Sequence, residues 1–499
     1  MRDISRRGFF RGSAAFGAGL ALPSLAACSN APAAAAIDSL HSLLPGRVVG
    51  RSDRDYTSFV TPWNLAWDKV RPKAAAIVRA TSTDDVAATL RWAEKTGTPI
   101  VARSGGHSYA GYSTTPGVVI DVSRMSGVEF SPSTNVATLG GGARNINVSS
   151  ELEKVGRTVT HGRCYQVGYA GLVLGGGIGF NVRRFGFACD QLLETTVVLA
   201  SGEVVRAAPD ENPDLLWAAK GGGGGNFGIH TSFVVQTYDA APITVFDVVW
   251  KENVDEVTRW LLDFARNAPR EFGAKITLRA TPDPSGPARL SVGLLGQFVG
   301  TADETMALLD PAFALAEPDR SYGFLREASY WDGQKKVSDK GDPEWSAERS
   351  VFIDNSLGDD GLGVILDHMR NWPPHQGLAQ WKAFVIGGAA NDVRPDATAF
   401  VHRRSWLLAA VDVAWHGGDS ESDIATSLRW LDEFHAALAQ YGSGAYQNFL
   451  DPREKNWAQA YYGENFGRLV AVKQQYDPRN VFHNGQSIPL DVMAFVNSN

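Results

Sequence analysis

Two side chains that can bond covalently to a cofactor, His107 and Cys164, stand in glycine-rich stretches of this 499-residue chain. The first stretch, Arg103-Ser-Gly-Gly-His107-Ser108, directly follows an apolar run at 99–102; the second is Cys164-Tyr-Gln-Val-Gly168. Glycine lets a backbone approach a ligand closely, and successive free N–H groups in such turns bind anions, above all phosphates. The pattern predicts that residues 103–190 grip one cofactor and offer it two attachment points.

A later glycine cluster spans residues 221–228. Gly223, Gly225 and Gly228 formally satisfy the dinucleotide-binding fingerprint. That fingerprint requires a strand before the glycines and a helix after them. Here a predicted helix at 212–220 precedes them and a predicted strand at 229–238 follows. The order argues against a Rossmann-type NAD site, so the glycines either wrap a cofactor edge or allow close packing.

Hydrophobic periodicity predicts short strands alternating with helices from residue 74 onward. In the first half, the patterns predict strands at 74–79, 98–102, 118–121, 136–139 and 229–238, a hairpin at 195–206, and helices at 83–96, 146–155 and 212–220, the first of these capped within 83–85. Between 241 and 440 the glycine clusters thin out. Strands predicted there at 275–279, 289–295 and 379–386 alternate with amphipathic helices at 254–265 and 427–440. This region reads as a separate unit.

Further motifs occur at both ends of the mature chain: Gly162-Arg-Cys164, Leu174-Gly-Gly-Gly-Ile-Gly179, Asn212-Pro-Asp-Leu-Leu-Trp217, Tyr446-Gln-Asn448-Phe-Leu-Asp451, Tyr461-Tyr-Gly-Glu-Asn-Phe466 and Asn484-Gly-Gln-Ser-Ile-Pro489. Together they resemble the berberine-bridge-enzyme-like FAD oxidoreductases of the vanillyl-alcohol-oxidase-type superfamily. The resemblance implies an α+β fold. A PCMH-type FAD-binding domain of two subdomains would span 37–240. An α+β substrate domain, an antiparallel sheet covered by helices, would span 241–440. The segment 441–499 would return to the FAD domain.

The same resemblance implies that FAD is bonded twice, to His107 through the flavin 8-methyl carbon and to Cys164 through flavin C6. The other residues that it implies as cofactor-binding are Arg103, Ser104, Gly105, Gly106, Ser108, Val167, Gly168, Gly175, Gly176, Gly177, Gly179, Asn226, Gly228 and Asn448. A disulfide between Cys164 and Cys189 is the alternative, because nothing in their spacing forbids it. Folding in a reducing cytoplasm before export would argue against that disulfide.

Tyr446 matches the position where many relatives place a catalytic tyrosine, so we expect it to take the substrate's hydroxyl proton. Free tyrosine titrates near pH 10, so a phenolate here would need a nearby cation. Lys382 and Arg403 are candidates by residue type. Arg403 and His402 belong to a short family motif at 399–403, expected on a strand, and we interpret both as making structural hydrogen bonds or ion pairs.

The function implied is oxidation of an alcohol or hemiacetal carbon on a sugar or a small aromatic-containing molecule. In this family the residue three positions after the attachment cysteine guards the path of oxygen, and a valine there, Val167, leaves it open. We therefore expect O2 as electron acceptor and H2O2 as product. The alternatives are a dehydrogenase that uses quinone or another acceptor and a catalytically silent flavin-bound binding protein.

The first 36 residues read as targeting sequence. Ser5-Arg6-Arg7-Gly8-Phe9-Phe10 and the weakly apolar run after it are typical of twin-arginine export. Leu25-Ala-Ala-Cys28 resembles a lipoprotein cleavage box, so Cys28 is a candidate lipid anchor, followed by a flexible tether. We expect a periplasmic, cell-envelope or extracellular protein. A net charge of −7 gives no electrostatic footprint for nucleic acid, and we expect no metal.

Overall fold

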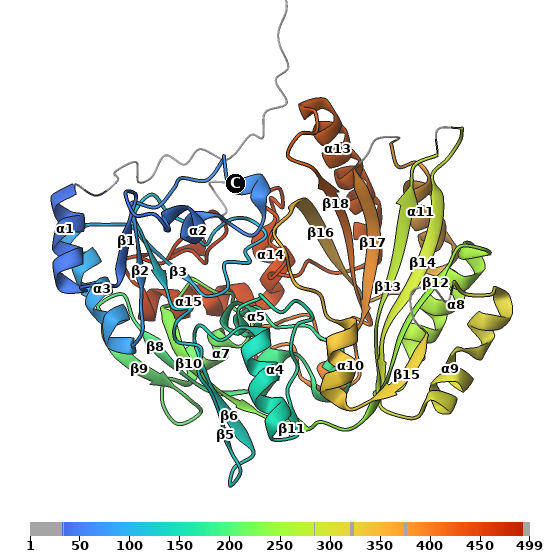
Figure 1. Ribbon diagram of the computed structural model, residues 1–499, viewed down its shortest axis with the longest axis horizontal. Helices are drawn as coiled ribbons and strands as arrows, with labels where there is room; N and C mark the ends of the chain where they lie inside the picture. Colours follow the sequence, from blue (N-terminus) through green and yellow to red (C-terminus); the bar gives the residue numbers. More distant parts are fainter. Residues whose placement is uncertain (1–31, 33, 284, 320–323, 374–376, 493–499) are drawn as a thin grey trace, which may run out of the picture.

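The computed structural model describes residues 32, 34–283, 285–319, 324–373 and 377–492. The twin-arginine pattern and Cys28 lie outside these ranges. The described chain forms two parts that meet along a central boundary (Figure 1). The blue and cyan N-terminal segments lie in the left-hand part, the yellow and orange segments lie mostly in the right-hand part, and the red C-terminal helix α15 (Phe466–Tyr476) lies back in the left-hand part.

The left-hand part begins with a four-stranded sheet in the order β1-β2-β4-β3. Its strands are β1 (Val48–Gly50), β2 (Ala76–Arg79), β3 (Ile100–Arg103) and β4 (Val118–Asp121), and its helices are α1 (Ala34–Leu43), α2 (Tyr56–Val60) and α3 (Thr83–Thr96). β2, β4 and β3 run parallel, whereas β1 is antiparallel to β2. Leu40 of α1 and Leu90 of α3 share a buried core with Ile120 of β4. This packing holds β3 in place, so the glycine-rich loop starts from a rigid strand end.

A five-stranded antiparallel sheet, in the order β5-β6-β10-β8-β9, completes the left-hand part. Its strands are β5 (Val128–Ser131), β6 (Val136–Gly140), β8 (Leu192–Val198), β9 (Val204–Ala207) and β10 (Ile229–Gln236); β7 (Arg157–Thr158) pairs separately with β11 (Tyr238–Asp239). The accompanying helices are α4 (Asn145–Lys154), α5 (Tyr169–Leu174), α6 (Val182–Phe185) and α7 (Pro213–Ala219). Leu139, Phe233 and Leu172 belong to the large buried core that the sheet shares with these helices.

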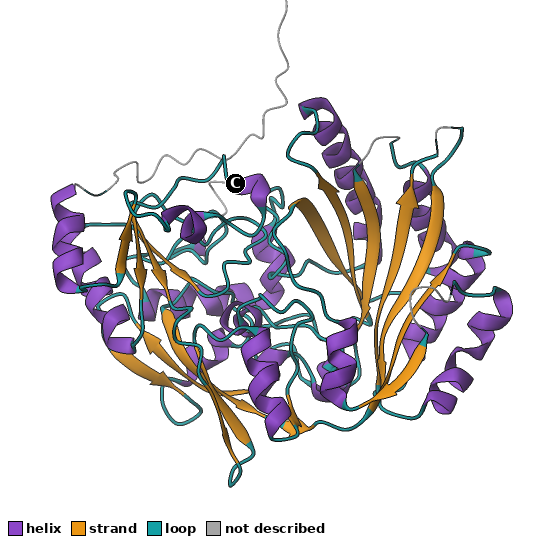
Figure 2. Cartoon of the chain, viewed as in Figure 1, coloured by secondary structure: helices purple, strands orange, loops and turns teal. Residues whose placement is uncertain are grey.

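The right-hand part is a seven-stranded antiparallel sheet in the order β15-β12-β14-β13-β17-β18-β16 (Figure 2). Its strands are β12 (Ile243–Trp250), β13 (Phe272–Thr281), β14 (Arg289–Phe298), β15 (Leu325–Ala328), β16 (Trp345–Ile353), β17 (Leu378–Val385) and β18 (Leu407–Trp415). Its helices are α8 (Val254–Asn267), α9 (Ala302–Leu315), α10 (Tyr330–Val337), α11 (Gly358–Arg370), α12 (Ala389–Asp392) and α13 (Glu421–Leu438). The expected fold class, α+β with an antiparallel sheet covered by helices, is confirmed.

Side chains on β17 and β18 alternate between the two faces of this sheet, as the pleat requires. Trp381 and Val411 pack in the core beneath α8, α9, α11 and α13. Lys382 and Asp412, one position further along each strand, face the other way and line a cavity between the two parts. The sheet therefore shows an apolar face to its helices and a partly charged face to the left-hand part.

Two local predictions differ from the structure. Ser82, before the expected cap at 83–85, caps α3, since its hydroxyl accepts a hydrogen bond from Asp85 N at 3.2 Å. The segment 399–403 is a loop instead of a strand, because Ala399 and Phe400 donate their N–H groups to the carbonyls of Trp217 and Lys220 at the end of α7.

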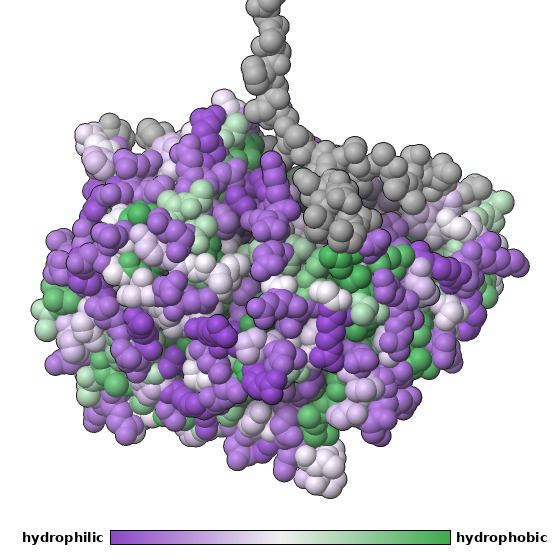
Figure 3. Space-filling view, turned by 180° about the vertical axis from the view of Figure 1, so that it is seen from behind, coloured by the Kyte–Doolittle hydropathy of each residue, from purple (hydrophilic) through white to green (hydrophobic). Residues whose placement is uncertain are grey.

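The surface carries mostly hydrophilic residues on the face seen in Figure 3, and hydrophobic residues there gather mainly in small patches. Within the described ranges, no helix combines the length and the apolar composition that a bilayer crossing requires.

The C-terminal segment is tied to the left-hand part through one buried lysine. Lys473 on α15 is fully buried, and its ammonium donates to the backbone oxygen of Asn226 and to the carboxylate of Asp477, both at 2.7 Å. Asp477 in turn accepts from the N–H of Phe482 at 2.9 Å. The side-chain oxygen of Asn226 accepts a hydrogen bond from Ile488 N at 3.0 Å, so the glycine cluster at 221–228 is joined both to α15 and to the segment around Ile488.

Replacing Lys473 by methionine should lower the free energy of unfolding by about 3 kcal/mol or more, because it leaves the Asp477 carboxylate buried without its cation. Urea denaturation followed by tryptophan fluorescence measures the change. Arg468→Met is the matched control on the same helix. Its pair with Asp214 is about half exposed, so we expect a loss below about 1 kcal/mol. Equal losses in the two variants would contradict the account.

Candidate active site

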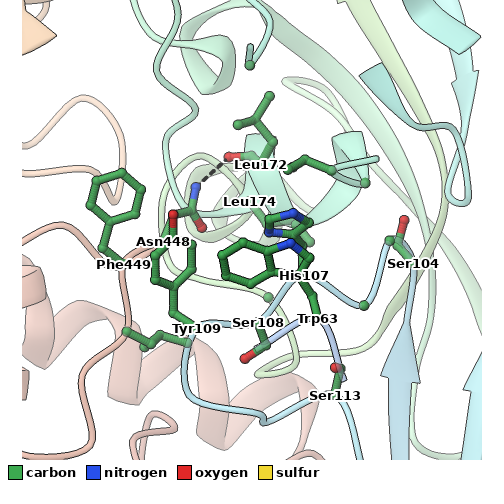
Figure 4. Close-up of a pocket in the computed structure, with 18 of the residues that line it drawn as sticks. Trp63, Ser104, His107, Ser108, Tyr109, Ser113, Leu172, Leu174, Asn448 and Phe449 are labelled. Atoms are coloured by element: carbon green, nitrogen blue, oxygen red, sulfur yellow. Dashed lines mark hydrogen bonds between the residues drawn. The ribbon is translucent and has the colours of Figure 1, made fainter. Parts of the chain in front are cut away.

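A cavity of about 680 Å³ lies between the two parts of the molecule. One wall comes from the glycine-rich loops after β3 and β7 and from the cluster at 223–228. The opposite wall comes from β13, β16, β17 and β18 of the large sheet. Figure 4 shows His107, Trp63, Tyr109, Asn448 and Phe449 gathered around it. The residues expected to carry chemistry thus meet in one space, although they are spread over most of the sequence.

A backbone contact between Gly105 and Gly168 joins the two glycine-rich loops. A Cβ added at Gly105 would overlap the backbone N of Gly168, and one added at Gly168 would overlap the backbone N of Gly105. Ser104 Oγ lies 2.5 Å from the position of that second Cβ. Only glycine at both positions lets the backbones pass this closely. The contact brings His107 and Cys164 to the same end of the cavity.

His107 lies flat against Trp63, with ring centroids 3.9 Å apart and planes at 22°. Its Nε2 is buried and has no hydrogen-bond partner among the described residues. Burial lowers the pKa of His107 to about 4, with the Asp339 carboxylate opposing that shift. The imidazole is therefore neutral at physiological pH and keeps a free nitrogen lone pair, which is the nucleophilic form of the ring.

Cys164 faces the same small volume as His107. The position that a Cβ would take on Gly341 lies 3.2 Å from Cβ of Cys164 and 3.3 Å from Nε2 of His107. Burial and the neighbouring Asp339 carboxylate raise the pKa of Cys164 to about 12, so the thiol is protonated at neutral pH. Cys164 and Cys189 are both free thiols, and Cys189 is buried in the core against Asp190. The alternative of a disulfide between them therefore has no support in the structure.

The other residues expected to bind the cofactor separate into two groups. The cavity is lined by Arg103, Ser104, Gly105, Gly106, Ser108, Val167, Gly168, Gly179, Asn226, Gly228 and Asn448. Gly175, Gly176 and Gly177 stand behind the wall, where added Cβ atoms would meet Asn448, Phe400 and Ala188 respectively. For these three, the glycine permits close packing of side chains that support the cavity.

Tyr446 is almost fully buried and lines the cavity beside Asn448. Its hydroxyl accepts hydrogen bonds from the Gly177 N–H at 2.9 Å and from Asn448 Nδ2 at 3.1 Å. Asn448 Nδ2 also donates to the Leu172 carbonyl at 2.9 Å, the dashed line in Figure 4. Burial raises the pKa of Tyr446 above its ordinary value, which disfavours a phenolate. The arrangement suits a positioning role for Tyr446 at least as well as the basic role expected from the sequence.

The two cations considered for activating Tyr446 are engaged with carboxylates. Arg403 is buried and forms a two-pronged ion pair with Asp190, at 2.6 and 2.8 Å, which is the structural role expected for it. Lys382 donates to Glu348 at 2.9 Å and to Asp412 at 3.2 Å. Burial lowers the pKa of Lys382, but these two carboxylates outweigh burial and raise it above its ordinary value.

Sequence reasoning missed most of the wall that the large sheet supplies. Its polar residues are Lys275, Glu348, Gln380 and Asp412, beside Lys382; Trp63, Tyr109 and Phe449 add aromatic surface. A single charged residue within an otherwise apolar strand could have identified these positions from the sequence. Asp412, for example, is the one charged residue in Leu-Leu-Ala-Ala-Val-Asp-Val-Ala-Trp, the sequence of β18.

The residues present fit a flavin dinucleotide. The glycine loops expose backbone where phosphates can approach, and His107 and Cys164 converge at the same end of the cavity. The unpartnered Nε2 of His107 is a buried polar atom with capacity for a further bond. The order helix, glycines, strand at α7, 221–228 and β10 excludes a Rossmann turn there, as predicted.

Comparison with known proteins identifies the family. Residues 74–208 match the FAD binding domain family, and residues 445–489 match the family described as berberine and berberine like. The chain is 31% identical over 454 residues to the uncharacterized FAD-linked oxidoreductase YgaK of Bacillus subtilis, covering 89% of this chain and 97% of that protein. It is 32% identical over 468 residues to the glucooligosaccharide oxidase of Sarocladium strictum, covering 87% and 90%.

Among solved structures, an Acremonium strictum glucooligosaccharide oxidase superposes with a TM-score of 0.80 at 26% identity, covering 90% of this chain and 98% of that one. Another structure of that enzyme is described as holding a 6-S-cysteinyl, 8α-N1-histidyl FAD. The matches extend over both parts of the molecule. The chain belongs to the berberine-bridge-enzyme-like family of FAD-linked oxidoreductases and is an enzyme that uses FAD.

Proposed function

We propose that the enzyme is a carbohydrate oxidase that holds FAD through both His107 and Cys164 and passes the electrons of an alcohol or hemiacetal carbon to O2. The observation that carries the proposal is that His107 and Cys164 face one small volume. His107 Nε2 and Cys164 Cβ each lie within 3.3 Å of the position that a Cβ on Gly341 would take. The Acremonium strictum glucooligosaccharide oxidase, similar over 90% of this chain, is described with a flavin bonded to a cysteine and a histidine.

Several residues of this chain support the two attachments. Trp63 stacks on the His107 ring, and its Nε1 donates to the Gly341 carbonyl at 3.1 Å, so the imidazole is held in one orientation. Asp339 pairs by backbone with the Cys164 segment, and its carboxylate raises the pKa of the thiol. We assign Asp339 as the group that would accept the thiol proton. The thioether would replace the C6–H bond of the flavin, a two-electron oxidation in which the flavin is the first electron acceptor and O2 the final one. Bound FAD supplies the acceptor for two electrons and one hydrogen from the substrate carbon.

The walls of the cavity favour a polyhydroxylated substrate. Carboxylates, an amide and ammonium groups from the sheet face the space, and aromatic surface from Tyr109, Phe384 and Phe449 lies beside them. Sugars present hydroxyl groups around their rim and C–H groups on their faces, and such a mixed wall can bind both. Three of the similar proteins are named as oxidases of glucooligosaccharides, xylooligosaccharides and chitooligosaccharides, which supports this substrate class.

Val167 lies where it can control access of O2 to the cavity. This side chain is partly buried and lines the cavity on the same turn as Cys164; its N–H donates to the Cys164 carbonyl at 3.3 Å. A valine leaves more room at that wall than a longer branched side chain would. We propose that this room is the path by which O2 reaches the reduced cofactor.

The test of the substrate class is anaerobic bleaching of the flavin by a panel of mono- and oligosaccharides beside phenolic alcohols. We expect sugars with a free reducing end to bleach the absorbance near 450 nm at millimolar concentration or below. Bleaching by phenolic alcohols alone would contradict the carbohydrate assignment. A protein that no alcohol bleaches but that still binds sugars would be the silent binding protein considered from the sequence.

The bicovalent attachment predicts the fate of FAD in denatured protein. The wild-type mass should include one FAD that denaturation does not release. Cys164→Ala and His107→Ala should each keep the flavin through the remaining bond, and the double variant should release it. Cys189→Ala is the matched control, because its thiol is buried away from the cavity and should not alter attachment. Intact mass spectrometry after acid denaturation measures the wild type and the four variants, and free FAD from the wild type would overturn the assignment.

The oxygen path predicts a separate effect of Val167→Leu. Stopped-flow mixing of reduced enzyme with aerated buffer should show fast reoxidation in the wild type and at least about tenfold slower reoxidation in the variant, a barrier change of about 1.4 kcal/mol. The rate of reduction by substrate should stay within about twofold, which serves as the internal control. Slow reoxidation in both proteins, with fast reduction of a quinone, would identify a dehydrogenase.

A further inference from the structure

Three buried ionisable side chains form one cluster on the cavity face of the large sheet. They are Glu348 on β16, Lys382 on β17 and Asp412 on β18, and the register pairs Glu348 with Asp412 across neighbouring strands. The Lys382 ammonium joins both carboxylates, and Gln380 Nε2 donates to the same Asp412 oxygen at 2.8 Å. Burying two carboxylates and an ammonium costs free energy even when the charges are paired, and apolar residues of similar size would often be as stable. We therefore look for a role of the cluster in the cavity that it lines.

Each carboxylate in this cluster keeps one oxygen without a partner. Glu348 bonds through Oε2 and Asp412 through Oδ2, while Oε1 of Glu348 and Oδ1 of Asp412 have no hydrogen-bond partner among the described residues. Glu348 is 6% exposed and Asp412 is 8% exposed. A buried carboxylate oxygen without a donor is unfavourable by about 1–3 kcal/mol or more. Because both residues line the cavity, the missing donors are best supplied by hydroxyl groups of a bound molecule.

The cluster lies close to the flavin attachment points. Burial raises the pKa of Tyr109, which lies two residues after His107, and the negative charges of Glu348 and Asp412 add to the rise. The Lys382 charge reaches the Cys164 thiol. Lys382 Nζ also stands 5.7 Å from the centroid of Phe449, and the ring of Phe449 packs 5.0 Å from that of Tyr109. A substrate placed beside the attachment points would therefore meet the sheet carboxylates.

We propose that Glu348 is the base that takes the proton of the substrate hydroxyl, and that Lys382 and Asp412 are positioning residues that hold it. This rests on the proposed oxidation of an alcohol carbon. In the reaction the hydroxyl O–H bond breaks and its proton passes to the Glu348 carboxylate. The C–H bond breaks and its hydrogen leaves with both electrons to the bound FAD, so the carbon–oxygen bond becomes double. Asp412 Oδ1 accepts a second hydroxyl of the same molecule, which selects polyhydroxylated substrates.

The charges around Glu348 give the proposal a pH signature. Lys382 from β17, Asp412 from β18, Glu344 before β16 and Tyr109 from the loop after β3 face it. Burial raises the pKa of Glu348 to about 7; Lys382 opposes the rise, and Asp412 and Glu344 add to it. A base must be ionised to act, so the rate of flavin reduction should fall as pH drops through neutrality. We call this fall the acid limb of the pH profile. Removing the charge of Asp412 should lower the pKa of Glu348 and move the acid limb to lower pH, whereas removing the charge of Lys382 should raise that pKa and move the limb to higher pH.

The experiment compares four variants of the FAD-loaded enzyme by anaerobic stopped-flow reduction between pH 5 and pH 9. Glu348→Gln should slow reduction by about 10²–10⁴-fold and abolish the acid limb. Asp412→Asn and Lys382→Met should keep the limb and shift it in opposite directions. Tyr446→Phe should keep the acid limb whatever its effect on the rate, because the Tyr446 hydroxyl holds Asn448 and does not carry the ionisation. Loss of the limb in Tyr446→Phe but not in Glu348→Gln would overturn the proposal and restore Tyr446 as the base.

A second readout does not depend on substrate. Infrared difference spectra of the wild-type holoenzyme, recorded across the same pH range, should contain a carboxylic acid C=O band that titrates near neutrality and is missing in Glu348→Gln. If no sugar bleaches the wild type, the proposed function fails while this band still tests the ionisation of Glu348. Absence of the band in the wild type, or its survival in Glu348→Gln, overturns the proposal. Unchanged reoxidation in each variant shows that the fold around the cofactor is intact.

Discussion

The site depends on the backbone contact between Gly105 and Gly168. These residues belong to loops that are far apart in sequence, one after a parallel strand and the other before α5. A side chain at either position would occupy the space of the other backbone, so the loops could not meet. Their contact places His107 and Cys164 around one position at the end of the cavity. The two bonds to FAD that we propose thus depend on two glycines, because only glycine at both positions lets the loops that carry His107 and Cys164 approach each other.

The large sheet supplies the second constraint, which is the cost of removing charge from water. Its apolar face packs against four helices, and its other face keeps Lys382 between two carboxylates. An isolated charge in that position would be neutralised or would destabilise the fold, but the triad satisfies part of its hydrogen-bonding capacity internally. The carboxylate oxygens that remain without a donor among the described residues belong to two residues that line the cavity. The same burial that makes the cluster energetically unfavourable raises the pKa of Glu348 to about 7. A general base is most effective when its pKa lies near the working pH.

Sequence reasoning predicted the elements that carry strong local signals. β4 lies at 118–121 as expected, and α3 spans 83–96 as expected, because alternation and helical spacing act over a few residues. It could not predict which strand faces meet. Glu348, Gln380, Lys382 and Asp412 come together only through the pairing of β16, β17 and β18, whose register is set by contacts far along the chain. Likewise, the motif around Tyr446 indicated a functional tyrosine, but it could not predict that the Tyr446 hydroxyl accepts hydrogen bonds from Gly177 and Asn448.

The most direct test of the account is a peptide map of the purified yellow protein. Trypsin cuts after Arg103 and Arg124 and after Arg163 and Arg183, so His107 and Cys164 fall in peptides 104–124 and 164–183. The account predicts one flavin-absorbing species that contains both peptides and a single FAD, with fragmentation placing the bonds at His107 and Cys164. Two separate peptides with FAD on only one of them, or FAD on neither, would contradict it.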